Sequence, residues 1–300
     1  MYIKYFYIKY IVRGNIKVIY PNVSFSFGRV RHSNWGDDLN MFFLPAVSKD
    51  KLLPGAMLVD CWGYPFSWLR GYDKYKCIGS VFDTIYESNT IVWGSGMIEE
   101  NKYPYVIPSK ILAVRGPLTQ QQLERKGINC PKIYGDPALL LPYFYEPRSV
   151  CKKYKLGLIP HYTDMFKEEV INLTESEDVL LINVFRYKNW KDVIDQICSC
   201  EFIASSSLHG LIVSEAYCIP NLWVEFREPL VGDIAKRFKF HDFFLSIGLD
   251  RKQPFVVTLK SSKLDVIQEA SKYVKAPGLS LKPLVEVCPF QLINPIKPIQ

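Results

Sequence analysis

The residues best suited to chemistry in this chain follow a short apolar segment near residue 204. They are Ser205, Ser206, Ser207, Leu208, His209 and Gly210. Residues 201–204 predict a buried strand, and residues 211–217 resume an apolar pattern at helical spacing. We therefore expect the three serines and the histidine at the carboxyl end of a strand and on the first turn of the next helix.

That position favours an anionic ligand. The first N–H groups of a helix have no partner within the helix, and the helix dipole is positive at this end. Serine hydroxyls add hydrogen-bond donors, and the imidazole of His209 can carry a proton. The segment predicts a site for a phosphate ester. The alternative is that the serines cap the helix and the histidine is an ordinary surface group.

Further polar residues follow other apolar segments of the chain. They are Asp37, Gly94, Ser95, Gly96, Arg115, Asp136 and His161. Ligands of open α/β sheets bind beyond the carboxyl ends of the strands, so these residues are expected around a cleft. An arginine at a helix start is poorly placed for the helix dipole, which points to an anion beside Arg115. The alternatives are a surface carboxylate as partner for Arg115, capping or turn roles for Asp37 and Asp136, and a tight turn at residues 94–96.

The elements that must position these residues alternate between short strands and helices. This order predicts an α/β fold with parallel sheets. Residues 146–153 read as a linker, so we expect an N-terminal Rossmann-like domain at 1–146, on the acceptor side, and a C-terminal one at 147–300. The second domain would hold the anion site and end in an extended tail. The two halves are expected to face each other across a cleft.

Composition narrows the class of protein. The chain has 300 residues, 48% of them hydrophobic, and a net charge of +7, which fits an ordered protein with anionic ligands. It has no arginine-rich stripe or module typical of nucleic-acid binding. The eight cysteines lack metal-ligand spacing and are expected to be reduced thiols of a cytoplasmic protein without a metal site.

The opening residues 1–14 are apolar and aromatic but contain two lysines and an arginine. They lack a signal-peptide cleavage site and are too short to span a bilayer. Two readings remain open: a weak peripheral contact with the inner face of the cytoplasmic membrane, or a helix packed on the first domain.

Six segments, in order, resemble the polysaccharide pyruvyltransferase family. They read WGDDLN, VWGSGM, ILAVRGPLT, YGDPALLLP, GLIPHYTD and SSSLHGLIVSEAYCIPN, and the resemblance runs over roughly residues 30 to 250. The resemblance implies a GT-B-like architecture of two Rossmann-like domains. It also implies transfer of pyruvate from phosphoenolpyruvate to two hydroxyls of one sugar, which forms a cyclic ketal on a capsule, exopolysaccharide or cell-wall glycan. Where family members carry an arginine before Leu-His-Gly, this chain has Ser207, which leaves Arg115 as the clearest donor-binding cation.

The chemistry implied by the resemblance assigns roles to the candidates. His209 would be the acid or phosphate partner, and Asp37 the base for the acceptor hydroxyl. The donor-binding residues would be Arg115, Ser205, Ser206, Ser207, Leu208, Gly210 and His161, with Gly94, Ser95, Gly96 and Asp136 in loops near the cleft. No metal and no cofactor beyond phosphoenolpyruvate as co-substrate is expected, and the acceptor would be a lipid-linked glycan.

Two other classes of function fit the same residues. The first is a GT-B glycosyltransferase that uses a nucleotide sugar. The second is a glycan-binding protein without catalytic activity. Retention of both His209 and Arg115 speaks against the second class.

Overall fold

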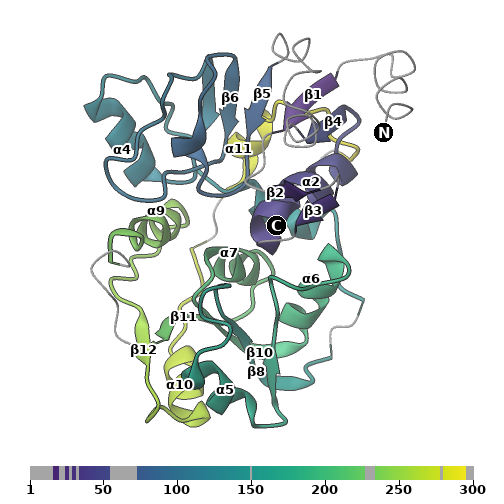
Figure 1. Ribbon diagram of the computed structural model, residues 1–300, viewed down its shortest axis with the longest axis vertical. Coiled ribbons are helices and arrows are strands. Elements are labelled where there is room, and N and C mark those ends of the chain that lie inside the picture. The colour runs from purple at the N-terminus through teal and green to yellow at the C-terminus, as the bar shows by residue number, and fades with distance from the viewer. Residues whose placement is uncertain are drawn as a thin grey trace.

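The computed structural model of the protein describes residues 16–19, 24–26, 29–31, 34–54, 73–148, 151–226, 234–277 and 280–294. Two five-stranded parallel sheets, each flanked by helices, make up the two halves of the molecule (Figure 1). The predicted α/β fold with parallel sheets is confirmed. The predicted membrane contact of residues 1–14 lies outside the described residues, as does Cys61.

The first sheet has the strand order β4-β1-β5-β6-β7. Its strands are β1 (Ile16–Ile19), β4 (Lys51–Pro54), β5 (Lys74–Lys76), β6 (Thr90–Trp93) and β7 (Lys110–Ala113). The same half contains α2 (Trp35–Val47), α4 (Pro117–Arg125), the short 3-10 helices η2 (Phe82–Thr84) and η3 (Pro137–Tyr143), and a small antiparallel hairpin of β2 (Ser24–Ser26) and β3 (Arg29–Arg31).

The second sheet has the strand order β12-β11-β10-β8-β9. Its strands are β8 (Tyr154–Ile159), β9 (Val179–Leu181), β10 (Cys200–Ser205), β11 (Asn221–Phe226) and β12 (Phe255–Val257). Its helices are α5 (Glu168–Thr174), α6 (Trp190–Cys198), α7 (Leu208–Ala216), α9 (Phe238–Ser246) and α10 (Lys263–Ala270). The predicted succession of strand, serine turn and helix is therefore present as β10 and α7.

Local sequence explains where the helices begin and end. Pro117 occupies the first turn of α4, where its missing N–H costs nothing, and Gly127 with φ 72° follows its end. The side chain of Asn34 accepts a hydrogen bond from the N–H of Gly36 and caps α2. The same first turn carries Asp37, which therefore does not act as the cap.

One buried apolar cluster runs through both halves. It includes Trp35 of α2, Leu140 of η3, Ile212 of α7 and Phe243 of α9. α7 is buried along its whole length from Leu208 to Glu215 because it lies between the two sheets, as Figure 1 shows. A helix that is apolar on all sides is suited to this central position.

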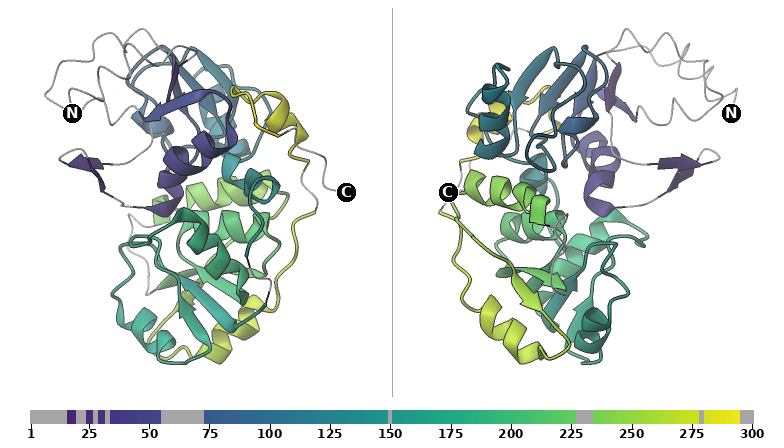
Figure 2. Two further views of the ribbon diagram at one scale, coloured as in Figure 1. Left: turned by 90° about the vertical axis from the view of Figure 1, so that its right-hand side faces the viewer. Right: turned by 60° about the vertical axis from the view of Figure 1, so that its left-hand side comes forward.

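The C-terminal segment returns to the first half. Figure 2 shows it running from the lower half to the upper, where α11 (Lys282–Glu286) lies against the first sheet. The indole Nε1 of Trp93 donates to the carbonyl of Leu284 at 2.9 Å, and the N–H of Ile293 donates to Val47 at 2.9 Å. The sequence predicted an extended tail on the second domain, whereas residues 282–286 form the helix α11, which contacts β6 of the first half. The boundary at residue 146 stays a prediction.

None of the helices within the described ranges combines the length and the apolar character that crossing a bilayer requires.

Candidate functional site

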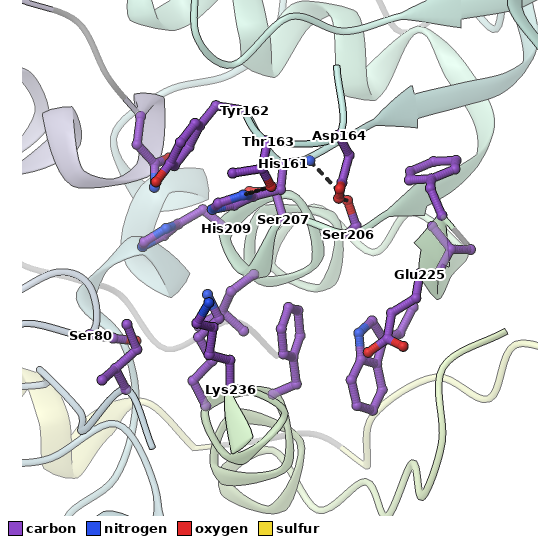
Figure 3. A pocket seen from close by; sticks show the side chains of 18 of the residues that line it. Ser80, His161, Tyr162, Thr163, Asp164, Ser206, Ser207, His209, Glu225 and Lys236 are labelled. Carbon is purple, nitrogen blue, oxygen red and sulfur yellow. Dashed lines mark hydrogen bonds between the residues drawn. The ribbon is translucent and has the colours of Figure 1, made fainter. Parts of the chain in front are cut away.

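A cavity of about 450 Å³ lies between the two halves, at the amino end of α7. The first half contributes Asn34, Asp37, Ser80 and Ile98. The second half contributes residues after β8 (161–164), the start of α7 (206–209), β11 (223–226), and Lys236, Lys239 and Phe240 at α9. Three of these groups follow or end parallel strands, as expected for ligand sites in α/β folds. Figure 3 shows His161, Ser207 and His209 on one wall and Lys236 on the wall facing them.

The start of α7 has backbone N–H groups that the helix does not use. The first N–H bonded within the helix is that of Leu211, which donates to the carbonyl of Ser207 at 3.3 Å. The N–H groups of the preceding turn are therefore not used by the helix, and the Ser207 side chain makes no capping hydrogen bond. Ser207 and Leu208 both line the cavity, so this helix end presents its donors to a ligand there.

Ser205 and Gly210 support this turn from behind. The Ser205 hydroxyl accepts from the N–H of Ser207 at 3.0 Å and donates to the carbonyl of Ile159, 2.9 Å away. A side chain at Gly210 would start 2.3 Å from the Ser205 Oγ, so glycine is required for this close approach. Neither residue lines the cavity. Sequence reasoning predicted both as donor-binding residues, and the structure places them behind the residues that line the cavity.

Ser206 and His161 lie on the cavity wall but have partners of their own. The Ser206 hydroxyl donates to Asp164 Oδ2 at 2.7 Å and accepts from the N–H of His161 at 2.9 Å. His161 Nδ1 lies 2.8 Å from the hydroxyl of Thr163. Burial, with the nearby charge of Lys239, lowers the pKa of His161 to about 4. His161 is therefore neutral at pH 7.

His209 stands at the junction of the two halves. A Cβ on Gly36 of α2 would lie 2.0 Å from its Nδ1, so the imidazole packs directly on the glycine backbone. Its Nε2 is buried without a hydrogen-bond partner and lies 3.8 Å from Asp136 Oδ2. Burial lowers the pKa of His209 to about 3, and the charges of Lys239 and Arg115 add to this effect. The ring is therefore neutral in the empty site.

Asp37 and Lys239 are two of the charged residues that line the cavity. Burial raises the pKa of Asp37 to about 7, although Lys239 and a hydrogen bond from Asn34 (3.2 Å) oppose this shift. Burial and the charge of Arg115 lower the pKa of Lys239 to about 8. Among the residues that the structure describes, Lys239 has no hydrogen bond or ion pair. Its ammonium is available to an anionic ligand.

Arg115 does not reach the cavity lining. Its guanidinium is closed to solvent and bonds to Asp242 (Nη2–Oδ2 3.0 Å), to the Ser80 hydroxyl (2.6 Å) and to the carbonyl of Met97 (2.7 Å). The sequence alternative was a surface carboxylate, whereas the carboxylate partner of Arg115 is Asp242, which is fully buried. The predicted donor contact of Arg115 would require the guanidinium to leave these partners. Its charge still acts on His209 and Lys239.

The glycine loop at residues 94–96 holds these groups in place. A Cβ on Gly96 would lie 2.5 Å from the Arg115 Cζ, and one on Gly94 would lie 2.4 Å from Pro137 Cδ. The Ser95 hydroxyl donates to the carbonyl of Gly79 at 3.0 Å. The loop thus fixes Arg115 and the turn that carries Asp136, and it does not line the cavity.

Sequence reasoning missed Lys236, Lys239 and Asn34. The two lysines are three residues apart in a basic segment, Lys236-Arg237-Phe238-Lys239, which reads as a solvated helix face. Their proximity to His209 depends on how α9 packs across the cavity, and no local pattern encodes that. Elsewhere in the described residues, no group of three or more His, Cys, Asp or Glu side chains could hold a metal ion.

Comparison with known proteins decides the family. The model of the polysaccharide pyruvyl transferase family matches residues 58–226, more than half of the chain. The chain belongs to the polysaccharide pyruvyl transferase family. The resemblance seen in the sequence motifs is thus confirmed, and the protein is a polysaccharide pyruvyltransferase. The matched range includes His209 and Arg115, whereas Asp37 and Lys239 lie outside it.

Two relatives of this pyruvyltransferase have curated names. The chain is 27% identical over 252 residues to the "Succinoglycan biosynthesis protein ExoV" of Rhizobium meliloti (strain 1021), which covers 82% of this chain and 69% of that protein. It is 29% identical over 227 residues to the "Uncharacterized protein L143" of Acanthamoeba polyphaga mimivirus, which covers 75% and 74%. The family and the first relative connect the enzyme to the synthesis of polysaccharides, and the family implies a glycan acceptor.

Proposed function

We propose that the cavity binds phosphoenolpyruvate and that the enzyme transfers its pyruvyl group to two hydroxyls of one sugar, forming a cyclic ketal. The observation that carries this proposal is the pairing of the open α7 amino end with the available ammonium of Lys239 across one cavity. Phosphoenolpyruvate carries a phosphate and a carboxylate on one enol carbon, so a helix end and a cation suit its two anionic groups.

The donor site uses side chains already in the cavity wall. The first-turn N–H groups of α7 and the Ser207 hydroxyl would hold one anionic group, and Lys239 would contact the anion from α9. A hydrogen bond from a charged group contributes about 1.5–3 kcal/mol. Ser205, Ser206 and Gly210 keep the turn in shape, and His161 lies beside it. Arg115 contributes charge from behind and holds α9 through Asp242.

The pKa values favour an exchange of the roles expected from the sequence. His209, expected as the acid, has a pKa of about 3, and Asp37, expected as the base, has a pKa of about 7. A nearby anion raises the pKa values of both groups. Asp37 therefore holds the proton when the donor is present, and neutral His209 is able to accept one. We assign Asp37 as general acid and His209 as general base.

The reaction then balances in four steps. Asp37 protonates the terminal methylene of phosphoenolpyruvate, and the central carbon becomes electrophilic. The first sugar hydroxyl adds to this carbon and loses its proton to His209. The C–O bond to phosphate breaks, and phosphate leaves with its electron pair. The second hydroxyl closes the ring and gives up its proton to the Asp37 carboxylate, while phosphate takes the proton from His209.

The cavity supports a two-part substrate. At about 450 Å³ it exceeds the space needed by a three-carbon phosphate ester, and the remainder would accommodate the acceptor sugar. Its walls come from both halves, as in a GT-B arrangement of two Rossmann-like domains divided near residue 146. The acceptor would be a lipid-linked glycan precursor of an exopolysaccharide, capsule or cell-wall polymer, met at the inner face of the cytoplasmic membrane.

Titration calorimetry with phosphoenolpyruvate tests the donor assignment. We expect Lys239→Ala to weaken binding about 10- to 150-fold, which corresponds to the loss of one charged contact. Lys272→Ala, which removes a surface lysine paired with Glu269, is the matched control and should bind as the wild type does. Wild-type affinity in Lys239→Ala, or tighter binding of a nucleotide sugar than of phosphoenolpyruvate, would overturn the proposal.

A further inference from the structure

Asp136 lies directly behind His209, on the side away from the cavity. Both side chains are buried, with exposed fractions of 0% for Asp136 and 5% for His209. The Oδ2 atom of Asp136 is 3.8 Å from Nε2 of His209, too far for a hydrogen bond in this arrangement, and this nitrogen has no hydrogen-bond partner. A buried N–H or nitrogen lone pair without a partner is costly, which makes the juxtaposition informative.

The two carboxylate oxygens of Asp136 have different surroundings. Oδ1 accepts from the N–H of Ala138 at 2.9 Å and caps η3, as an ordinary turn residue would. Oδ2 accepts from the N–H of Gly79 at 3.3 Å and is the atom that faces His209. Capping of η3 explains the position of Oδ1 but not that of Oδ2. The position of Oδ2 beside a buried ring nitrogen is not required by the turn.

The turn that carries Asp136 is rigidly supported. Gly135 has φ 136°, and a Cβ there would lie 3.0 Å from Leu284 of α11, the segment that returns from the second half. Gly94 contacts the same turn from the other side, since its Cβ would lie 2.7 Å from the carbonyl of Gly135. The turn that carries this carboxylate is thus contacted by two separate parts of the chain.

We propose that Asp136 is a positioning residue that holds His209 in the tautomer with its proton on Nε2 and its lone pair on Nδ1. A carboxylate accepts but does not donate, so it favours a proton on the nitrogen that faces it. Nδ1 is then the nitrogen that takes a proton from the acceptor hydroxyl, and the Asp136 charge stabilises the imidazolium that forms. The catalytic consequence rests on the proposed function, whereas the tautomer can be measured on the protein without any ligand.

Other charges around His209 do not specify a tautomer. Lys239 from α9 and Arg115 from the end of β7 both disfavour the imidazolium, and neither can accept a proton from the ring. Asp37 of α2 lies on the cavity side. A Cβ on Gly79 would lie 2.7 Å from Oδ1 of Asp37 and 3.8 Å from Cε1 of His209. Asp136 is the carboxylate that Nε2 faces.

The test is the ring ¹⁵N spectrum of histidine-labelled protein without ligand. The chain has four histidines, and the signals of His209 are identified by their absence in His209→Gln. In the wild type we expect a protonated, pyrrole-type Nε2 and a pyridine-type Nδ1. Asp136→Asn keeps a good cap for η3 but presents an amide N–H to Nε2, so the two signals should exchange types. Asp265→Asn, at the exposed cap of α10, is the control and should leave them unchanged.

Two results would overturn the inference. One is a spectrum of the wild type that shows His209 protonated on Nδ1. This measurement does not depend on the folding of any variant. The other is an unchanged Nε2 signal in folded Asp136→Asn. Turnover offers a second measure: Asp136→Asn should lose at least about a hundredfold in kcat, as wrong-tautomer variants do, with phosphoenolpyruvate affinity within about threefold. If phosphoenolpyruvate fails to bind the wild type, the proposed function fails while the tautomer result stands.

Discussion

Asp242 of α9 and Arg115 at the end of β7 form an ion pair that is closed to solvent and joins the two halves of the molecule. The pair is 3.0 Å long, and Asp242 also accepts from the N–H and the hydroxyl of Thr119, at 2.9 and 2.7 Å. Lys239 lies three residues before Asp242, nearly one turn earlier on the same helix. The ion pair therefore fixes the helix that brings Lys239, the cation proposed to bind the donor, to the cavity.

Removing one partner of this pair should destabilise the protein strongly. Arg115→Ala leaves Asp242 charged and buried, and breaking a buried pair costs about 3–5 kcal/mol. Urea denaturation measures this loss. Arg148→Ala, which removes an arginine 68% exposed and 3.8 Å from Asp195, should change the stability by less than about 1 kcal/mol. If Arg115→Ala keeps wild-type stability yet loses phosphoenolpyruvate binding, the direct donor contact expected from the sequence is right.

Gly36→Ala should displace His209. At an exposed position in a helix, alanine in place of glycine stabilises by about 1 kcal/mol. Here the new methyl group would lie 2.0 Å from Nδ1 of His209, so the imidazole must leave its present position. We expect lower thermal stability and at least about a tenfold loss of turnover. A gain in stability with full turnover would show that the ring is not packed on Gly36.

Asp37→Asn should make the protein more stable at pH 8. The native pKa of Asp37 is about 7, above the ordinary value of 3.8. The folded protein therefore binds more protons than the unfolded chain between these values, and its stability falls as the pH rises through this interval. The neutral amide avoids that loss. At 1.36 kcal/mol per pKa unit, the gain is on the order of 2–4 kcal/mol at pH 8 and disappears near pH 4.

Denaturation of the Asp37→Asn variant and the wild type at several pH values checks whether the stability of the variant exceeds that of the wild type as the pH rises. Turnover should be abolished at every pH, because the amide cannot deliver a proton. Equal stability of variant and wild type at pH 8 would mean that burial does not raise the Asp37 pKa.

Donor affinity should depend on the charge of Lys239. Its native pKa is about 8, so the ammonium loses its proton, and its attraction for an anion, as the pH rises through this value. Lys239→Arg keeps a cation that does not titrate in this range. We expect phosphoenolpyruvate affinity to fall between about pH 7.5 and 9.5 in the wild type and to fall less in Lys239→Arg. Parallel pH profiles of the two proteins would exclude Lys239 as the titrating group.

Local sequence signals predicted the scaffold of this site well. The apolar segment before Ser205 and the apolar helical pattern after it are strong local patterns, and both β10 and α7 form where they indicate. Pro117 and Gly127 bracket α4 for the same reason. Strand ends predicted where His161 and His209 would lie, because parallel strands deliver their carboxyl ends to one edge of a sheet.

The arrangement between distant segments could not be predicted from local patterns. Whether Arg115 meets a ligand or a carboxylate depends on α9, which is more than a hundred residues away in sequence. The sequence predicted that Arg115 is the cation of the site. In the packed halves Arg115 instead pairs with Asp242, and Lys239 lies at the cavity. The supporting role of Ser205 could not be predicted for a similar reason. Some serine hydroxyls of this turn lie on the cavity wall and others bond to the backbone behind it, and local sequence does not distinguish them.

Transfer from phosphoenolpyruvate to a glycan tests the central claim most directly. The enzyme is incubated with phosphoenolpyruvate and a panel of lipid-linked or synthetic glycans, and phosphate release and glycan mass are followed together. We predict one phosphate released for each glycan that gains a pyruvate ketal. In His209→Gln we expect the rate to fall by at least about a hundredfold. Transfer of a sugar from a nucleotide sugar, with no ketal formed from phosphoenolpyruvate on any glycan, would contradict the account.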